Sequence, residues 1–155
     1  MTQTIADILT LERTQLGAHC TSKKRLLEHV SDFLSGHIAD TTADEIYDNL
    51  ITREKLGSTG IGEGIAIPHS RLRQCVNTVG ALFLLDEAID FDAIDRQPVD
   101  LIFVLLVPEE ATEEHLKTLS MLATLFNDPN FRSTLRHAND TQNLYDLAIQ
   151  FKVPA

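Results

Sequence analysis

The chain has 155 residues, with 13 Lys and Arg against 23 Asp and Glu, and its formal charge at pH 7 is −10. That length suits one domain over residues 1–155, and a composition that is 43% hydrophobic and 23% charged argues against a disordered chain. The charge and the lack of a long apolar run exclude a nucleic-acid-binding protein and a membrane-embedded one. The only cysteines, Cys20 and Cys75, do not form a disulfide framework, so the cytoplasm is the expected compartment.

Hydrophobic spacing and capping residues predict the elements of the first half of the chain. A short amphipathic turn covers Ile5 to Leu11, and Gln15 to His19 suits an edge strand. A helix is expected to begin at the capping residues Thr21 to Lys24. A second capping signal begins at Thr41, and its helix continues to about Leu56.

A glycine-rich segment then leads into a short strand. Gly57 to Gly64 holds four of the seven glycines of the chain, and Ile65 to Ile67 reads as a strand that Pro68 stops before His69. The segment is neither a Walker A loop, which needs Gly-Lys-Ser/Thr, nor the dinucleotide fingerprint, because its third glycine comes one place early. It is either a mobile connection or a cradle of backbone N–H groups for an anion.

The second half contains two apolar runs followed by helices. Val79 to Leu85 and Val99 to Val107 read as buried strands, and about 13 residues without a clear helix separate them, which favours antiparallel or mixed pairing. One helix is expected from about Thr112 to Phe126, another from Asp128-Pro129 and a last one from Asp140 or Thr141. The expected fold is an α/β domain with a mixed sheet and helices packed on both faces. The residues expected on the apolar face of the first helix are Leu116, Leu119, Leu122, Ala123 and Phe126.

Three side chains are candidates for chemistry. Pro68 holds the backbone rigid where it presents His69, and a histidine near neutral pKa acts as acid, base, metal ligand or nucleophile. His115 lies in the first turn of a helix that follows a buried strand, either facing inward at a site or touching solvent at a helix end. Arg53 is either an ordinary cation at a helix C-terminus or a planar fork that binds phosphate. A zinc site from both histidines lacks a recognisable ligand spacing, so no metal is expected.

The sequence around these residues resembles a known family. Arg53 to His69, and in particular Gly57-Ser58-Thr59-Gly60-Ile61-Gly62 and Ile67-Pro68-His69, closely resembles the active-site segment of IIA domains of the bacterial phosphotransferase system, fructose/mannitol family, and most of all its nitrogen-regulatory branch. Phe91 to Asp100, Leu105 to Pro108 and His115 to Ser120 match as well, so the resemblance covers nearly the whole chain. Ser70 departs from it, because many members have glycine there.

The resemblance implies a phosphoryl relay that needs no cofactor. His69 corresponds to the phosphoryl acceptor, and His115 and Arg53 to residues that stabilise the phosphoryl group. The donor would be an HPr-like phosphocarrier (NPr), and the acidic chain suits a basic donor. Regulatory targets in potassium transport and metabolism would respond to the phosphorylation state. The residues expected to add loop contacts to phosphate are Ser58, Thr59, Gly60, Ile61 and Gly62.

Three other functions remain open at this point. A sugar-transport IIA component would keep the same chemistry and hand the phosphoryl group to a IIB domain for fructose or mannitol. A non-catalytic binding module would keep the fold and lose the relay. A metal-dependent hydrolase would use both histidines as ligands.

Overall fold

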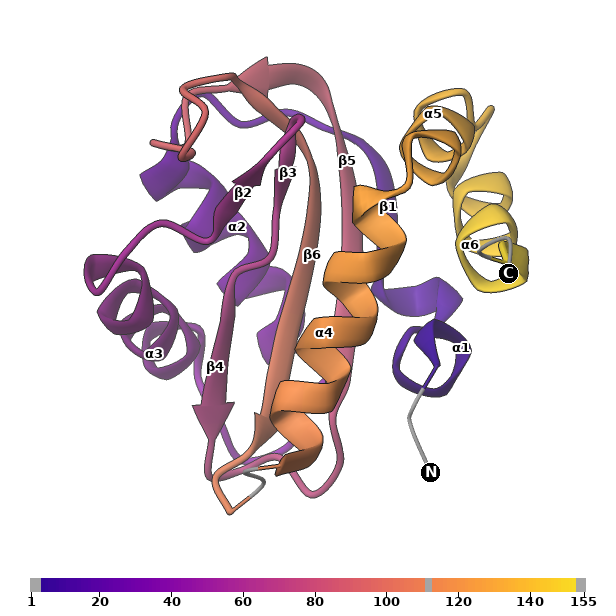
Figure 1. Cartoon of the computed structure of the whole chain (residues 1–155). Helices are drawn as coiled ribbons and strands as arrows, with labels where there is room; N and C mark the ends of the chain where they lie inside the picture. The colour runs from indigo at the N-terminus through magenta and orange to yellow at the C-terminus, as the bar shows by residue number, and fades with distance from the viewer. Residues whose placement is uncertain (1–3, 111–112, 153–155) are drawn as a thin grey trace.

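The computed structural model describes residues 4–110 and 113–152, and these form a sheet with helices on both sides (Figure 1). The start of the helix expected from Thr112 lies outside the described residues. Each of the four helices α2, α3, α5 and α6 begins at a side chain that accepts a hydrogen bond from the first turn, and the caps Ser22, Thr42 and Asp140 fall within the capping segments that the sequence predicted. The helices are α1 (Ile5–Ile8), α2 (Lys23–Ser35), α3 (Ala43–Lys55), α4 (Glu113–Asn127), α5 (Pro129–Arg136) and α6 (Thr141–Gln150), with a 3-10 turn at Leu11–Arg13.

The sheet is mixed and runs in the order β1-β5-β6-β3-β2, with β4 also paired to β6. The two long central strands pair antiparallel, as the missing crossover helix predicted, whereas β1 pairs parallel to β5 and both β3 and β4 pair parallel to β6. The strands are β1 (Thr14–Ala18), β2 (Gly60–Gly62), β3 (Ile65–Ala66), β4 (His69–Leu72), β5 (Val79–Ile89) and β6 (Val99–Pro108).

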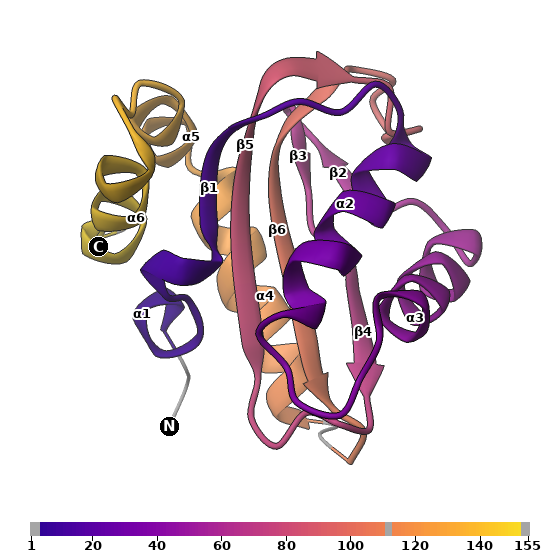
Figure 2. The ribbon, with the colours of Figure 1, turned by 180° about the vertical axis from the view of Figure 1, so that it is seen from behind.

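Each face of the sheet has its own apolar core. Alternate residues of a strand point to opposite faces, so neighbours in β6 divide between the two cores: Val104 faces α2 and α3, and Phe103 faces α4, α5 and α6. Figure 2 shows α2 lying across the first face, and Figure 1 shows α4 lying across the other. The expected architecture, a mixed sheet covered on both faces, is confirmed.

The strand that leads to the histidine is longer than the sequence suggested. We expected it to stop at Pro68, but it resumes at His69 as β4. The pairing with β6 keeps one register, with Ile65 opposite Leu101 and His69 opposite Leu105. The reason is the length of β6, which has 10 residues and offers partners on both sides of the proline. Three smaller departures are that β2 forms within the glycine-rich segment, β5 runs on to Ile89, and α1 ends at Ile8.

One helix face was partly mispredicted. Leu122 and Phe126 of α4 are buried, but Ala123 is exposed and Leu116 has 66% of its surface exposed. The buried residues of α4 are Thr118, Leu122 and Phe126, which are spaced four residues apart and form a narrower stripe than the one we expected. Among the described residues, no helix is long and apolar enough to cross a membrane.

Candidate functional site

A hollow of about 370 Å³ lies where α3, β4 and the first turn of α4 meet. Arg53, His69 and His115, which are far apart in the sequence, all line it. Arg53 comes from the last turn of α3, His69 from the first position of β4 and His115 from the third residue of α4. The other lining residues are Asn49, Thr52, Leu56, Ser70 and Arg71.

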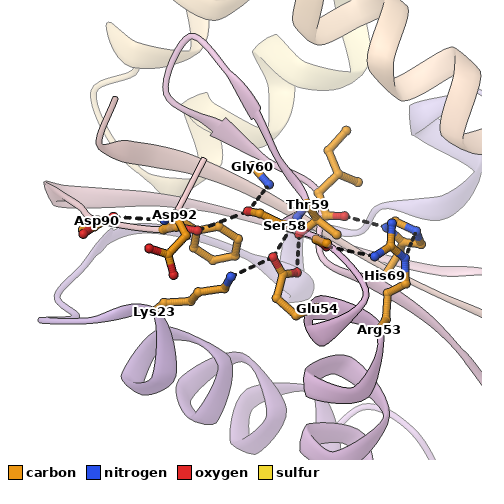
Figure 3. Close-up of polar contacts among 12 residues, drawn as sticks. Lys23, Arg53, Glu54, Ser58, Thr59, Gly60, His69, Asp90 and Asp92 are labelled. Carbon is orange, nitrogen blue, oxygen red and sulfur yellow. Dashed lines mark hydrogen bonds and ion pairs between the residues drawn. The ribbon is translucent and has the colours of Figure 1, made fainter. Parts of the chain in front are cut away.

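The ring of His69 has different partners on its two nitrogens. Nδ1 lies 2.7 Å from the carbonyl oxygen of Ile67, and because a carbonyl only accepts, Nδ1 carries the ring proton. Nε2 is then the nitrogen with the free electron pair, and it receives a hydrogen bond of 3.3 Å from Nε of Arg53 (Figure 3). The unprotonated nitrogen is therefore the one beside the guanidinium.

Arg53 is held by a second contact of its own. Its Nη1 donates to the carbonyl oxygen of Gly57 at 3.0 Å, just beyond the end of α3. With Nη1 fixed there and Nε directed at His69, the edge of the guanidinium faces the ring nitrogen. A planar fork in this position suits the spread negative charge of a phosphoryl group.

His115 lies beside the first histidine ring. The two ring centroids are 5.5 Å apart at an interplanar angle of 47°. Its Nδ1 is buried and makes no hydrogen bond within the described part of the chain. That leaves Nε2 of His115 as the nitrogen able to donate toward a group bound to His69.

Both histidines are held in the neutral form at neutral pH. Burial lowers the pKa of His69 below its ordinary value of 6.5, and the charge of Arg53 lowers it further, while the hydrogen bond that the ring donates to the Ile67 carbonyl and the charge of Glu54 act in the opposite direction. Burial also lowers the pKa of His115, and the charges of its neighbours add to this. A neutral imidazole is the form that attacks phosphorus.

The segment expected to bind phosphate is occupied with other contacts. The hydroxyl of Ser58 donates to the carbonyl oxygen of Phe91 at 3.2 Å, and Gly60 N donates to that hydroxyl at 3.0 Å. The N–H and hydroxyl of Thr59 both donate to a buried carboxylate, Glu54. Ile61 and Gly62 line a separate hollow under α4. None of the residues from Ser58 to Gly62 lines the hollow around His69.

Sequence reasoning missed three contributors to this site. The acceptor for Nδ1 is the main chain of Ile67, which no side-chain pattern reveals. Glu54 is buried beside Arg53, and a carboxylate at an inward-facing position of a helix was a signal that could have been read. Arg71, two residues beyond His69 in β4, follows the alternation of a strand onto the same face.

Metal binding finds no support in the geometry. Among residues 4–110 and 113–152, no three His, Cys, Asp or Glu side chains gather as a metal ion would require. Cys75 is buried, and burial raises the pKa of its thiol to about 11, so it stays protonated.

A family model described as phosphoenolpyruvate-dependent sugar phosphotransferase system, EIIA 2, matches residues 7–150. The chain belongs to this family. Members carry or transfer phosphoryl groups within a chain of phosphocarrier proteins, and the pairing of His69 with an arginine is consistent with that chemistry.

Individual relatives narrow the assignment. A nitrogen regulatory protein of Pseudomonas aeruginosa is 45% identical, over 94% of this chain and 94% of that protein. The crystal structure of nitrogen regulatory protein IIA-Ntr from Neisseria meningitidis is 40% identical, with a TM-score of 0.87 over 93% of this chain and 98% of that one. A fructose-specific EIIABC component of Bacillus subtilis is 30% identical, over 94% of this chain and 23% of that protein. The chain therefore stands with the nitrogen-related IIA proteins rather than with the sugar-specific ones.

Proposed function

We propose that this chain is a cytoplasmic phosphocarrier whose phosphoryl acceptor is Nε2 of His69. In the transfer step, the electron pair of Nε2 forms a bond to phosphorus while the phosphorus–nitrogen bond of a phosphohistidine on the donor breaks. The electron pair of that broken bond returns to the imidazole of the donor. The transferred group leaves again in the same way, to a downstream acceptor or to water.

The observation that carries this proposal is that the two nitrogens of the His69 ring have different partners. The contact of 2.7 Å between Nδ1 and the Ile67 carbonyl supports a single tautomer, with the free electron pair at Nε2. The lowered pKa of His69 supports a neutral ring at pH 7, caused first by burial. The nucleophile needs no base before it attacks, and the N–H of Arg53 Nε turns from the electron pair of Nε2 to an oxygen of the incoming phosphoryl group.

Arg53 and His115 are proposed to stabilise the phosphoryl group during transfer. Phosphoryl transfer depends mostly on positioning and on charge placed where the equatorial oxygens develop negative charge. The Arg53 guanidinium lies 3.3 Å from Nε2, so it is within reach of an oxygen bound there. His115 would offer Nε2–H to another oxygen, since its Nδ1 is buried without a partner among the described residues. The segment Ser58 to Gly62 serves this scheme by holding the site together rather than by touching phosphate.

The proposed donor is an HPr-like phosphocarrier of the nitrogen-related branch (NPr). The relatives named nitrogen regulatory protein favour a regulator that binds its targets according to its phosphorylation state, and potassium-transport or metabolic regulators are the targets we propose. A phosphoryl group adds nearly two negative charges at pH 7, which is enough to change the affinity of an interface centred on His69. Transfer to a fructose- or mannitol-specific IIB domain is the alternative, which the lower identity to a fructose-specific component disfavours.

The test is intact-mass spectrometry after incubation with phosphoenolpyruvate, enzyme I and an HPr-type donor. We expect one acid-labile phosphate on the wild-type protein and none on His69→Gln. The matched control is His137→Gln, because His137 also directs Nδ1 at a carbonyl oxygen 2.7 Å away but, within residues 4–110 and 113–152, is not paired with an arginine in the hollow around His69. A phosphate that persists in His69→Gln would overturn the assignment of the acceptor.

A further inference from the structure

A buried carboxylate lies directly behind the site. Glu54 has 5% of its surface exposed and follows Arg53 in the last turn of α3. Its Oε1 accepts from Thr59 N at 2.7 Å and from Lys23 Nζ at 2.9 Å, and its Oε2 accepts from the Thr59 hydroxyl at 2.6 Å (Figure 3). The phosphoryl-transfer scheme above assigns this cluster no role.

One route leads from the carboxylate to the arginine. Two hydrogen bonds to Thr59 tie the segment after α3 back to the helix, and Gly57 lies within the short loop that they close. The carbonyl oxygen of Gly57 accepts from Nη1 of Arg53 at 3.0 Å, and Nε of the same guanidinium faces His69. Any shift of this loop would therefore rotate the guanidinium relative to Nε2.

A second route leads from the same threonine to the histidine. The carbonyl oxygen of Thr59 accepts from Ile67 N at 3.0 Å. The carbonyl oxygen of Ile67 is the acceptor for Nδ1 of His69 at 2.7 Å. Thr59 thus connects Glu54 to the main-chain group that determines which nitrogen of His69 carries the proton.

We propose that Glu54, held by Lys23, is a positioning residue for phosphoryl transfer that fixes both the Arg53 guanidinium and the His69 tautomer through Thr59. The expected effect of Glu54 on the rate of phosphoryl transfer rests on the proposed function. The expected effect on the His69 tautomer does not. Glu54 does not touch the reacting atoms.

The chemistry of the cluster requires a carboxylate and a cation. Three donors converge on residue 54, and a carboxylate accepts from all of them, whereas an amide would direct its NH₂ group at a donor. Lys23 is the first residue of α2, where the helix dipole disfavours a cation, so its place there is explained by Glu54 rather than by the helix. Lys23 Nζ also lies 4.7 Å from the centroid of the Phe91 ring, which keeps the ammonium in place over the loop.

The experiment compares Glu54→Gln and Thr59→Val with wild type, with Thr59→Ser as the variant that restores the hydroxyl. Asp100→Asn is the matched control, because Asp100 also forms a partly buried ion pair, with Arg136 at 2.8 Å, but lies outside the hollow around His69. The first readout is the ¹⁵N chemical shifts of the His69 ring in the unphosphorylated protein, which report its tautomer. The second is the single-turnover rate of phosphoryl uptake from the phosphorylated HPr-type donor and from phosphoramidate, a small donor that needs no docking surface.

We expect Glu54→Gln and Thr59→Val to give a mixture of His69 tautomers and to slow uptake from both donors by about tenfold or more, as a misplaced catalytic group does. Thr59→Ser and Asp100→Asn should keep one tautomer and a rate within about twofold of wild type. If Glu54→Gln fails to fold, Thr59→Val, which removes only one hydroxyl contact, carries the test.

The proposal is overturned if the folded variants keep the wild-type tautomer and rate, or if Asp100→Asn perturbs both readouts equally. If the wild-type protein accepts no phosphoryl group, the proposed function fails, and the tautomer measurement still decides whether Glu54 positions His69.

Discussion

At the scale of single residues, the site depends on one ring with two different surroundings. His69 gives its proton-bearing nitrogen to a main-chain carbonyl and turns the other toward Arg53. Burial and the nearby guanidinium both disfavour the imidazolium form. Both features therefore keep the ring neutral at neutral pH.

Lowering the pH should decrease the free energy of unfolding, because His69 becomes protonated. Because the pKa of this side chain is lower in the folded protein than its ordinary value of 6.5, the folded state binds the proton less tightly than the unfolded chain. Its contribution to stability is complete above pH 6.5 and is lost as the pH falls through the lowered folded pKa. We expect the free energy of unfolding, measured in urea, to decrease from about pH 7 to about pH 5, and less steeply in His69→Gln. An equal decrease in both proteins would assign the effect to other groups.

Removing the Arg53 guanidinium should change both the pKa of His69 and the rate of phosphoryl uptake. In Arg53→Met, loss of the positive charge should raise the pKa of His69, because that charge is one of the causes that lower it. Phosphoryl uptake should slow by roughly 10²-fold, the usual effect of losing one preorganised electrostatic contact. Proton NMR titration of the His69 ring and single-turnover kinetics measure the two effects. A lower pKa in Arg53→Met would contradict this account of the site.

At the scale of elements, capping residues and apolar runs predicted most of the fold. The starts of α2, α3 and α6 and the antiparallel pair β5 and β6 were readable because each depends on neighbours in the sequence. The continuation of β3 into β4 was not, since it depends on β6, which lies about 35 residues further along the chain. Likewise, the sequence identified the glycine-rich segment but not its contacts, because Glu54 and Phe91 are what occupy its polar groups.

Replacing Gly60 tests whether the glycine-rich segment must pack directly against Ala93. A Cβ built on Gly60 would lie 2.8 Å from Cβ and 3.0 Å from Cα of Ala93, with backbone involved and no flexible side chain to move. Gly60→Ala should therefore destabilise the protein by about 1–3 kcal/mol, the usual effect of overpacking. The measurement is a urea titration with Gly36→Ala as control, because a Cβ there would meet only Phe33 O, at 3.6 Å. Equal stability of the two variants would show that β2 and its neighbour can move apart without cost.

At the scale of the whole molecule, an apolar core packs on each face of the sheet. The site lies where helices from the two faces meet at β4. Arg53 comes from the α3 side and His115 from α4 on the opposite side, with His69 between them in β4. A sheet held on both faces keeps these two helices at a fixed separation. The geometry of the site is thus a property of the complete fold, which explains why local patterns alone did not reveal that these residues meet.

The net charge should control how fast the donor arrives. At −10, the chain attracts a basic donor over distances that salt screens. We expect the second-order rate of uptake from the phosphorylated HPr-type donor to fall several-fold between about 50 mM and about 500 mM NaCl, while uptake from phosphoramidate changes little. Stopped-flow or quench kinetics at both salt concentrations give the comparison. A rate from the protein donor that is independent of salt would show that charge does not steer this encounter.

The acceptor for His69 Nδ1 is a main-chain atom, and this has a consequence for how the protein can change over generations. Every amino acid supplies the same carbonyl at position 67, so no codon change there removes the group that selects the tautomer. A substitution at this position must preserve the packing of the buried side chain and the N–H that donates to Thr59 O, which proline lacks. The carbonyl oxygen that accepts from His69 Nδ1 is in this way protected from point mutation at the residue that supplies it.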